Sequence, residues 1–260
     1  MSGGPLGVPT LTASIPWVAI PSAVLVGLSL GLLGSGGSIL AVPLLTAVVG
    51  LPFAVAKATS FPVVGLAAAA ALGLHLRQRS VRLREALPFV CASVPFAFLA
   101  SHEVRMEERS QTALFAALML VAAWRMAVGA PTDDGPRRRR SLGAIAACGA
   151  TAGALTGLLG VGGGFLIVPA LVLTLGFDVR SAVATSLLVI VLNCAAGLAA
   201  DQLGPATPVR WDLAALFSGI GVVGALAGQR LSSRFSPRAL RRTFAVVVVL
   251  AAVVLIARTF

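Results

Sequence analysis

Long apolar runs separated by short polar loops dominate the chain. A helix that crosses the hydrocarbon core of a bilayer needs about 20 residues, with a range of about 17–25. Six runs suit a single crossing: Phe53–Leu74, Ala86–Ser101, Ser110–Trp124, Ser181–Ala200, Leu213–Gln229 and Thr243–Ala257. The pattern therefore predicts an all-α, polytopic helical membrane protein.

Two further runs, Trp17–Val49 and Leu142–Phe177, are too long for one crossing and short for two. Each contains the same glycine-rich break, "GLLGSGGSILAVPLL" at 31–45 and "GLLGVGGGFLIVPAL" at 157–171. Residues 27–73 align with 153–199 without a gap. This internal repeat predicts two four-segment halves, 1–135 and 136–260, which meet in the Pro-, Asp- and Arg-rich linker at 130–140.

The charges of the loops indicate that the two halves have opposite orientations. The loop 75–84 carries four arginines and 102–109 a mixture of signs, whereas in the second half 201–212 has a single arginine and 230–242 has five. Because cytoplasmic loops are enriched in Lys and Arg, the equivalent loops fall on opposite sides of the membrane. We therefore expect an inverted repeat, with 75–84, 130–141 and 230–242 in the cytoplasm and both termini outside.

Inversion requires an odd number of crossings in each half, so each broken segment either enters and returns as a re-entrant hairpin or crosses twice. The second arm of the first break, 38–50, has 13 residues. It would rise only about 20 Å, against a hydrocarbon core of about 30 Å. This length favours the hairpin.

The composition supports a membrane protein, since 58% of the residues are apolar and 11% are charged. The net charge of +11 comes from basic residues clustered between apolar runs, a topology signal that requires no nucleic-acid partner. Cys91, Cys148 and Cys194 are widely spaced, so neither a disulfide framework, a metal site nor a cofactor is indicated. The amino terminus shows no cleavable leader and is interpreted as a mature terminus.

The repeated break is the candidate site. Non-helical backbone at membrane depth is tolerated only where it is buried in protein or lines a wet cavity. A helix that restarts after the glycines, at Ser38 and at Gly164, presents free N–H groups and a positive dipole end that suit an anion. We expect the two helix starts to meet near the midplane and to form one shared pocket. The alternative is that the glycines only allow close helix packing, as is expected for Gly27 with Gly31 and for Gly224 with Gly228.

Polar side chains near the breaks extend this site. Thr59-Ser60 and Thr185-Ser186 either bond back to a carbonyl of the preceding turn or donate to an oxyanion. Lys57, the only lysine, either snorkels to the interface or compensates the charge of a substrate. Asn193 is either a link between helices or a donor. The candidate substrate-binding residues are Gly34, Gly36, Gly37, Ser38, Lys57, Thr59, Ser60, Gly160, Gly162, Gly163, Gly164, Thr185, Ser186 and Asn193.

No acidic residue is expected deep within a crossing, so the sequence argues against proton coupling through a carboxylate. An enzyme ranks last among the function classes, because the crossings supply no acid, base or metal ligand. A secondary transporter of a small oxyanion, working by alternating access, ranks first. A membrane accessory or assembly protein that transports nothing is the alternative.

At these residues the sequence resembles the TauE/SafE family, described as sulfite exporters and related anion permeases. The resemblance rests on 157–197 and the weaker copy at 31–60, and the first copy departs from the pattern with Ser38 and Lys57. It implies movement of sulfite, or of a related organosulfur or carboxylate anion, across the cytoplasmic membrane of a bacterium. The implied partners are a small anionic substrate and the lipid bilayer.

Overall fold

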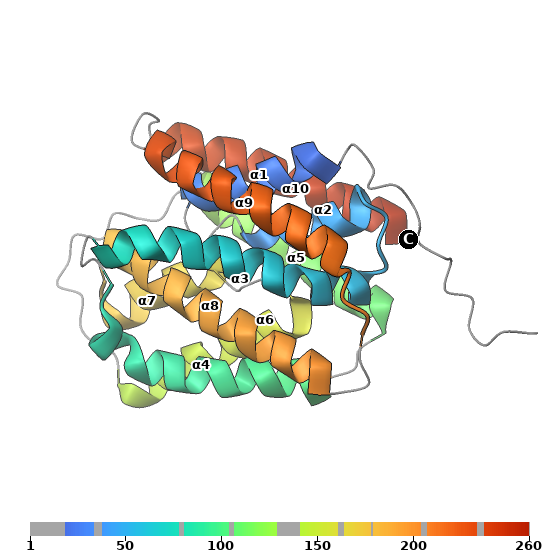
Figure 1. The fold of residues 1–260 in the computed structure, drawn as a ribbon. Coiled ribbons are helices and arrows are strands. Elements are labelled where there is room, and N and C mark those ends of the chain that lie inside the picture. The colour runs from blue at the N-terminus through green and yellow to red at the C-terminus, as the bar shows by residue number, and fades with distance from the viewer. Residues whose placement is uncertain are drawn as a thin grey trace, which may run out of the picture.

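The computed structural model describes residues 19–33, 38–77, 81–103, 107–128, 141–160, 164–177, 179–203, 207–232 and 237–259. These residues form ten helices and contain no strand, so the all-α prediction is confirmed (Figure 1). The helices are α1 Ala19–Leu33, α2 Ala41–Ala47, α3 Phe53–Arg77, α4 Leu83–Glu103, α5 Glu108–Val128, α6 Leu142–Leu159, α7 Gly164–Leu175, α8 Val179–Leu203, α9 Trp211–Ser232 and α10 Pro237–Thr259.

Five of the described helices, α3, α4, α6, α8 and α9, are long and apolar enough to cross a membrane. The predicted crossings at Ser110–Trp124 and Thr243–Ala257 lie in α5 and α10, which are not among them, and are not confirmed. The apolar part of α10, Ala245–Ala257, is short. At 18 residues α6 would rise about 27 Å, whereas the 12 residues of α7 would rise about 18 Å. The re-entrant hairpin therefore stays a prediction.

Both apolar runs with glycine motifs are interrupted where the sequence predicts. The helix α1 ends at Leu33, and the chain resumes with a 3₁₀ turn at 38–40 before α2. The helix α6 ends at Leu159, and the next residue, Gly160, caps it with a left-handed φ of 69° and an N–H that donates to Thr156 O at 2.9 Å. The described part of α7 begins at Gly164, where a restart is predicted, whereas after Ser38 the α-helix α2 begins only at Ala41. Gly34, Gly36, Gly37, Gly162 and Gly163 lie outside the described residues.

Helices from the two halves alternate across the molecule. The packing order is α1 on α9, α9 on α3, α3 on α8, α8 on α4 and α4 on α6, while α5 packs against α10 (Figure 1). Because the repeat makes α1 equivalent to α6, α3 to α8 and α4 to α9, this order reads the same from either end. The first helix of each half therefore packs against a helix of the other half.

Small residues allow these contacts between halves. A Cβ added to Gly27 would lie 2.5 Å from Gly221 O, and one added to Gly31 would collide with Ala225 O. At the equivalent positions of α6, Gly153 and Gly157 lie equally close to the backbone of Ser93 and Ala97 in α4. The packing role predicted for Gly27 and Gly31 is confirmed, and it recurs in the second half.

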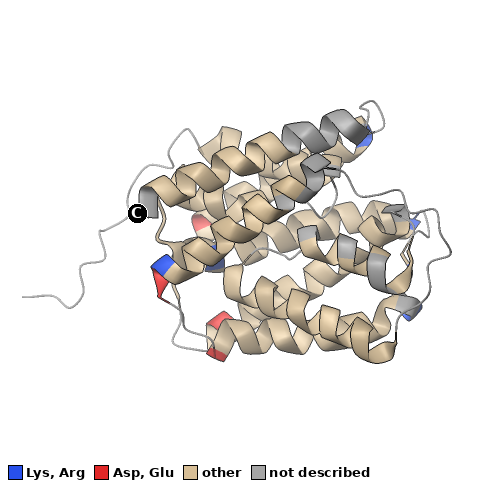
Figure 2. Ribbon diagram, turned by 180° about the vertical axis from the view of Figure 1, so that it is seen from behind, with Lys and Arg blue, Asp and Glu red and all other residues tan. Residues whose placement is uncertain are grey.

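The central pair, α3 and α8, is antiparallel. Lys57 lies beside Asp201, Gly197 lies against the Phe61 ring, and Gly65 lies against Cys194, so residue numbers rise along one helix as they fall along the other. The carboxyl ends of α3 and α8 therefore lie at opposite ends of the bundle, which an inverted repeat requires. Figure 2 colours the ribbon by residue type and shows the described charged residues mainly at these two ends, one basic and the other of mixed sign. The assignment of the ends to membrane sides stays a prediction.

Candidate functional site

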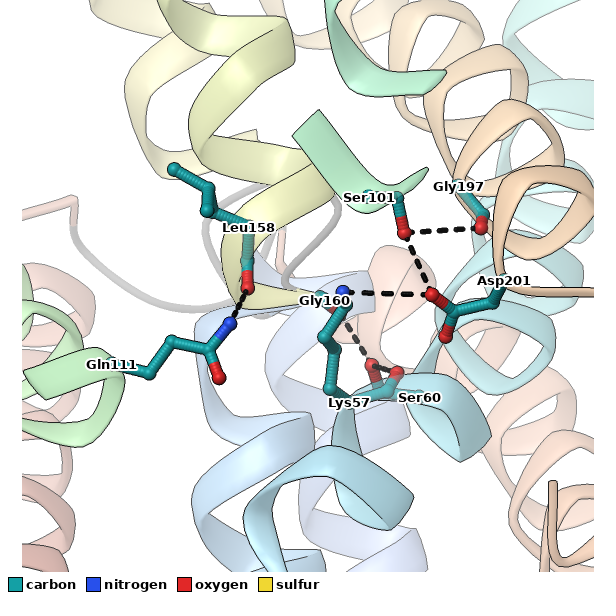
Figure 3. Close-up of polar contacts among 8 residues, drawn as sticks. All are labelled: Lys57, Ser60, Ser101, Gln111, Leu158, Gly160, Gly197 and Asp201. Carbon is teal, nitrogen blue, oxygen red and sulfur yellow. Dashed lines mark hydrogen bonds and ion pairs between the residues drawn. The ribbon is translucent and has the colours of Figure 1, made fainter. Parts of the chain in front are cut away.

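A buried ion pair joins α3 to α8. Lys57 Nζ lies 3.6 Å from Asp201 Oδ1, and the two side chains are only 9% and 6% exposed (Figure 3). The snorkelling interpretation of Lys57 is wrong, because the side chain points into the bundle. The sequence placed Asp201 in a loop, whereas α8 continues to Leu203 and buries Asp201 near its carboxyl end. The structure therefore provides a buried acid at the end of a candidate crossing, although not deep within it. Lys57, from another helix, makes that burial tolerable.

Only one of the two oxygens of the Asp201 carboxylate has hydrogen-bond or ion-pair partners among the described residues. Ser101 Oγ lies 2.9 Å from Asp201 Oδ1 and 3.3 Å from Gly197 O (Figure 3). Asp201 Oδ2 is buried and has no hydrogen-bond partner among the described residues. Buried charges are costly unless they are paired and hydrogen-bonded, so this oxygen is an exception that requires an explanation.

The glycine break of the second half lies directly against this ion pair. A Cβ added to Gly160 would approach Lys57 Cγ to 2.5 Å, and Gly160 O accepts a hydrogen bond from Ser60 Oγ (Figure 3). Gln111 Nε2 donates to Leu158 O at 2.9 Å and so ties α5 to the same helix end. The carboxyl end of α6 carries partial negative charge, and Lys57 supplies the cation that such an end favours. We call Lys57, Thr59, Ser60, Ser101, Gly160 and Asp201 the lysine cluster.

The predicted hydroxyl groups make matching contacts in the two halves. Thr59 Oγ1 accepts from Arg210 N at 3.2 Å, and at the equivalent position Thr185 Oγ1 accepts from Arg82 N at 3.1 Å. Ser60 Oγ lies 2.6 Å from Lys57 O, and Ser186 Oγ donates to Val183 O at 2.7 Å. The serines therefore bond back to the carbonyl three residues earlier. Each threonine hydroxyl accepts and retains a proton that it can donate.

The structure does not bring the two Thr-Ser pairs together. Because Lys57 faces Asp201 and Phe61 faces Gly197, the level of Thr59 corresponds to residue 199 of α8. Thr185 lies 14 residues away along that helix, or roughly 20 Å at 1.5 Å per residue. One small anion cannot contact both pairs at once, so the expectation of a single shared pocket needs correction to two clusters at different depths.

Asn193 lies between these clusters, about eight residues from each along α8. Its Nδ2 donates to Ser93 Oγ at 2.8 Å, and both side chains are buried. The repeat-equivalent pair is Ala67 and Gly221, which meet through apolar contact alone. The contact supports the interpretation of Asn193 as a link between α8 and α4. Of the remaining candidates, Ser38 is fully buried in the turn before α2.

A hollow of about 300 Å³ between α2, α5 and α10 shares no lining residue with either cluster and is lined by Thr46, Phe53, Glu108, Thr112 and Leu255, among others. Glu108 Oε1 accepts from Phe53 N at 2.7 Å, at the amino end of α3. This carboxylate caps a helix and makes the hollow a poor place for an anion.

Comparison with known proteins identifies the family. The family model described as "Sulfite exporter TauE/SafE" matches residues 19–255, which include the two broken segments, the central helix pair and the lysine cluster. The chain belongs to the TauE/SafE family. It is therefore a multi-pass membrane protein of a transporter family, and its bacterial relatives fit a place in the inner membrane.

Relatives of this TauE/SafE chain carry the same general description. A "Probable membrane transporter protein" of Xylella fastidiosa (strain Temecula1) is 34% identical over 256 residues, covering 94% of this chain and 95% of the relative. The protein of strain 9a5c matches to the same extent. A "Probable membrane transporter protein" of Methanocaldococcus jannaschii is 30% identical over 190 residues, covering 69% of this chain and 71% of the relative. No solved structure matches the chain.

Proposed function

We propose that this TauE/SafE chain is a secondary transporter that moves a small anion across the cytoplasmic membrane by alternating access. The substrate class is sulfite or a related organosulfur or carboxylate anion. The observation that supports this best is Lys57, a buried cation beside a glycine break inside an apolar bundle. Ionisable groups within membrane helices are rare and mark substrate or ion pathways.

In this proposal the two clusters contact the anion in succession. The lysine cluster offers the Lys57 ammonium and the Thr59 and Ser60 hydroxyls, together with the backbone amides of Gly162, Gly163 and Gly164. The Gly160 N–H is already bonded to Thr156 O. The second cluster offers Thr185 and Ser186, with the amides of Gly34, Gly36, Gly37 and Ser38. Asn193 lies between them. A separation of roughly 20 Å suits a path through the bundle better than one enclosed pocket.

The packing of the helices supports alternating access. Equivalent positions make equivalent contacts, as in Thr59 with Arg210 and Thr185 with Arg82. Inverted repeats permit such transporters to open to either side, because exchanging the conformations of the two halves turns one state into the other. The antiparallel α3 and α8 provide the central element about which this exchange occurs.

A counterflow assay tests the transport proposal. Proteoliposomes that contain the purified chain are loaded with unlabelled sulfite, and entry of labelled sulfite is followed at equal pH on both sides. Methanesulfonate and acetate are tested as competitors, and protein-free liposomes correct for leak. We expect counterflow from the wild type and a loss of at least about tenfold for Lys57→Met, which removes roughly 1.4 kcal/mol or more of anion binding.

The matched control is Arg230→Met, which removes an exposed cation from the end of α9. It should transport as the wild type does. Counterflow by Lys57→Met at the wild-type rate would remove Lys57 from the substrate path. Absence of counterflow by the folded wild type for every anion in the panel would instead favour the accessory-protein alternative.

A further inference from the structure

The lysine cluster carries a charge imbalance as soon as an anion enters it. Lys57 and Asp201 neutralise each other in the structure, with side chains that are 9% and 6% exposed. A monovalent anion, such as hydrogensulfite or methanesulfonate, that approached Lys57 would leave one uncompensated negative charge in a region of low dielectric constant, which is strongly unfavourable. Addition of one proton restores neutrality.

Asp201 is the group that can take this proton. Its Oδ1 is held by Ser101 and Lys57, while Oδ2 is buried without a hydrogen-bond partner among the described residues. Protonation at Oδ2 would turn this unsatisfied acceptor into a donor. An anion oxygen beside Lys57 would accept from it, so the bound anion would satisfy the atom that the empty site leaves without a partner.

The fold itself does not require the ion pair. The repeat-equivalent positions of Lys57 and Asp201 are Val183 and His75, which cannot form an ion pair of this kind, although the same helices pack there. The equivalent of Ser101 is Gln229, whose Nε2 lies 2.9 Å from His75 Nε2. Since one half packs without the pair, helix packing alone does not account for it, and the pair is available for a function at one end of the bundle.

Several other ionisable groups at this end have partners of their own. On α4, His102 Nδ1 lies 2.8 Å from Glu103 Oε1, and on α5 Glu108 accepts from the amide of Phe53. At the start of α9, Arg210 pairs with Asp212. Lys57 is the only ionisable side chain among the described residues that the structure places in contact with Asp201.

We propose that Asp201 is a proton-binding site that couples anion transport to proton movement. This inference rests on the proposed function. When the anion binds, Lys57 pairs with the anion in place of the Asp201 carboxylate, and Asp201 takes one proton from water at Oδ2. The anion and the proton then cross together. When the anion leaves, the proton returns to water and the ion pair forms again.

The experiment compares counterflow with accumulation driven by a pH gradient. Wild-type and Asp201→Asn proteoliposomes are first assayed for counterflow with labelled sulfite and labelled methanesulfonate at equal pH. Accumulation is then measured with labelled methanesulfonate, which carries one negative charge at both pH values, under an alkaline interior and a clamped membrane potential. Asn keeps the shape of the protonated carboxyl group but cannot release a proton. We expect the wild type to accumulate methanesulfonate by up to about tenfold per pH unit above protein-free liposomes, the limit for one coupled proton.

The Asp201→Asn variant should retain counterflow, with a lower half-saturation concentration because Lys57 no longer has a competing carboxylate, and should lose the accumulation driven by the gradient. Glu103→Gln, an exposed substitution at the same end of the bundle, is the matched control and should behave as the wild type. Gradient-driven accumulation that survives in Asp201→Asn, or that is absent from a wild type with counterflow, would overturn the coupling role alone. Absence of all counterflow would contradict the transport proposal itself.

Infrared difference spectroscopy on the wild type keeps the inference testable if Asp201→Asn does not fold. Addition of sulfite to the purified protein should produce the carbonyl-stretch band of a protonated carboxylic acid. Glu103→Gln should leave the band in place, since Glu103 lies outside the cluster. A spectrum without this band, recorded where sulfite binding is saturated, would rule out proton uptake by Asp201.

Discussion

At the scale of single residues, two geometric facts require a glycine at position 160. Its φ of 69° is left-handed, and a Cβ would collide with Lys57, whose Cγ would lie 2.5 Å away. The positive-φ glycines Gly50 and Gly176 occupy equivalent positions in the two halves. The sequence could predict a break at Gly160 from the repeated motif. It could not predict which side chain the glycine touches, because Lys57 lies 103 positions earlier in the chain.

We expect Gly160→Ala to lower the stability of the folded protein by at least about 1–2 kcal/mol, the cost of a left-handed residue with a side chain, before the collision with Lys57 is included. Thermal unfolding in detergent measures the effect. Gly73→Ala is the control, because Gly73 lies in α3 with no atom near its Cβ position, and helix propensity there favours Ala by about 0.5–1 kcal/mol. Equal unfolding temperatures for the two variants would contradict the close contact at Gly160.

At the scale of elements, the two halves are held together because the first helix of each half packs against a helix of the other half. The close approach of α1 to α9 is repeated by α6 and α4, with glycines and other small residues at matching positions. Within a membrane, helices associate through such close packing, because lipid is as apolar as the side chains that it replaces. The glycine spacing allowed the sequence to predict close packing, but not the partner helix.

We expect Gly31→Ala and Gly157→Ala to destabilise the protein by similar amounts, on the order of 1–3 kcal/mol each, because both Cβ atoms would meet a backbone carbonyl of the partner helix. Thermal unfolding and size-exclusion chromatography follow the effect. The control is Gly219→Ala in α9, where no atom lies near the Cβ position. Clearly unequal losses of stability would show that the contact of α1 with α9 is not equivalent to the contact of α6 with α4.

At the scale of the whole molecule, the direction of each helix decides which loops share a side of the membrane. The antiparallel α3 and α8 send Arg77 and Asp201 to opposite ends of the bundle. His75 lies beside Gln229, so α3 and α9 end together. These relations agree with the distribution of basic loops along the sequence, which points to the end with Arg77 as the cytoplasmic one.

Accessibility of single cysteines tests this topology. In a chain whose Cys91, Cys148 and Cys194 are replaced by serine, Arg77→Cys and Gln202→Cys should react with a membrane-impermeant maleimide from opposite sides. Arg230→Cys should follow Arg77→Cys, because α3 and α9 end at the same end of the bundle. Labelling of positions 77 and 202 from one side would contradict the inverted repeat and, with it, the alternating path for the anion.

The sequence by itself determined the membrane class, the helical fold and the two breaks, because hydrophobicity and glycine content act locally on each segment. It also revealed the duplication and, through Lys57, the one cation in an apolar run. Only the tertiary structure decided that Asp201 is buried beside Lys57 and that the Thr-Ser pairs are far apart. The physical reason is that a buried charge is stable only with a partner, and that partner comes from a helix more than 100 residues distant in sequence.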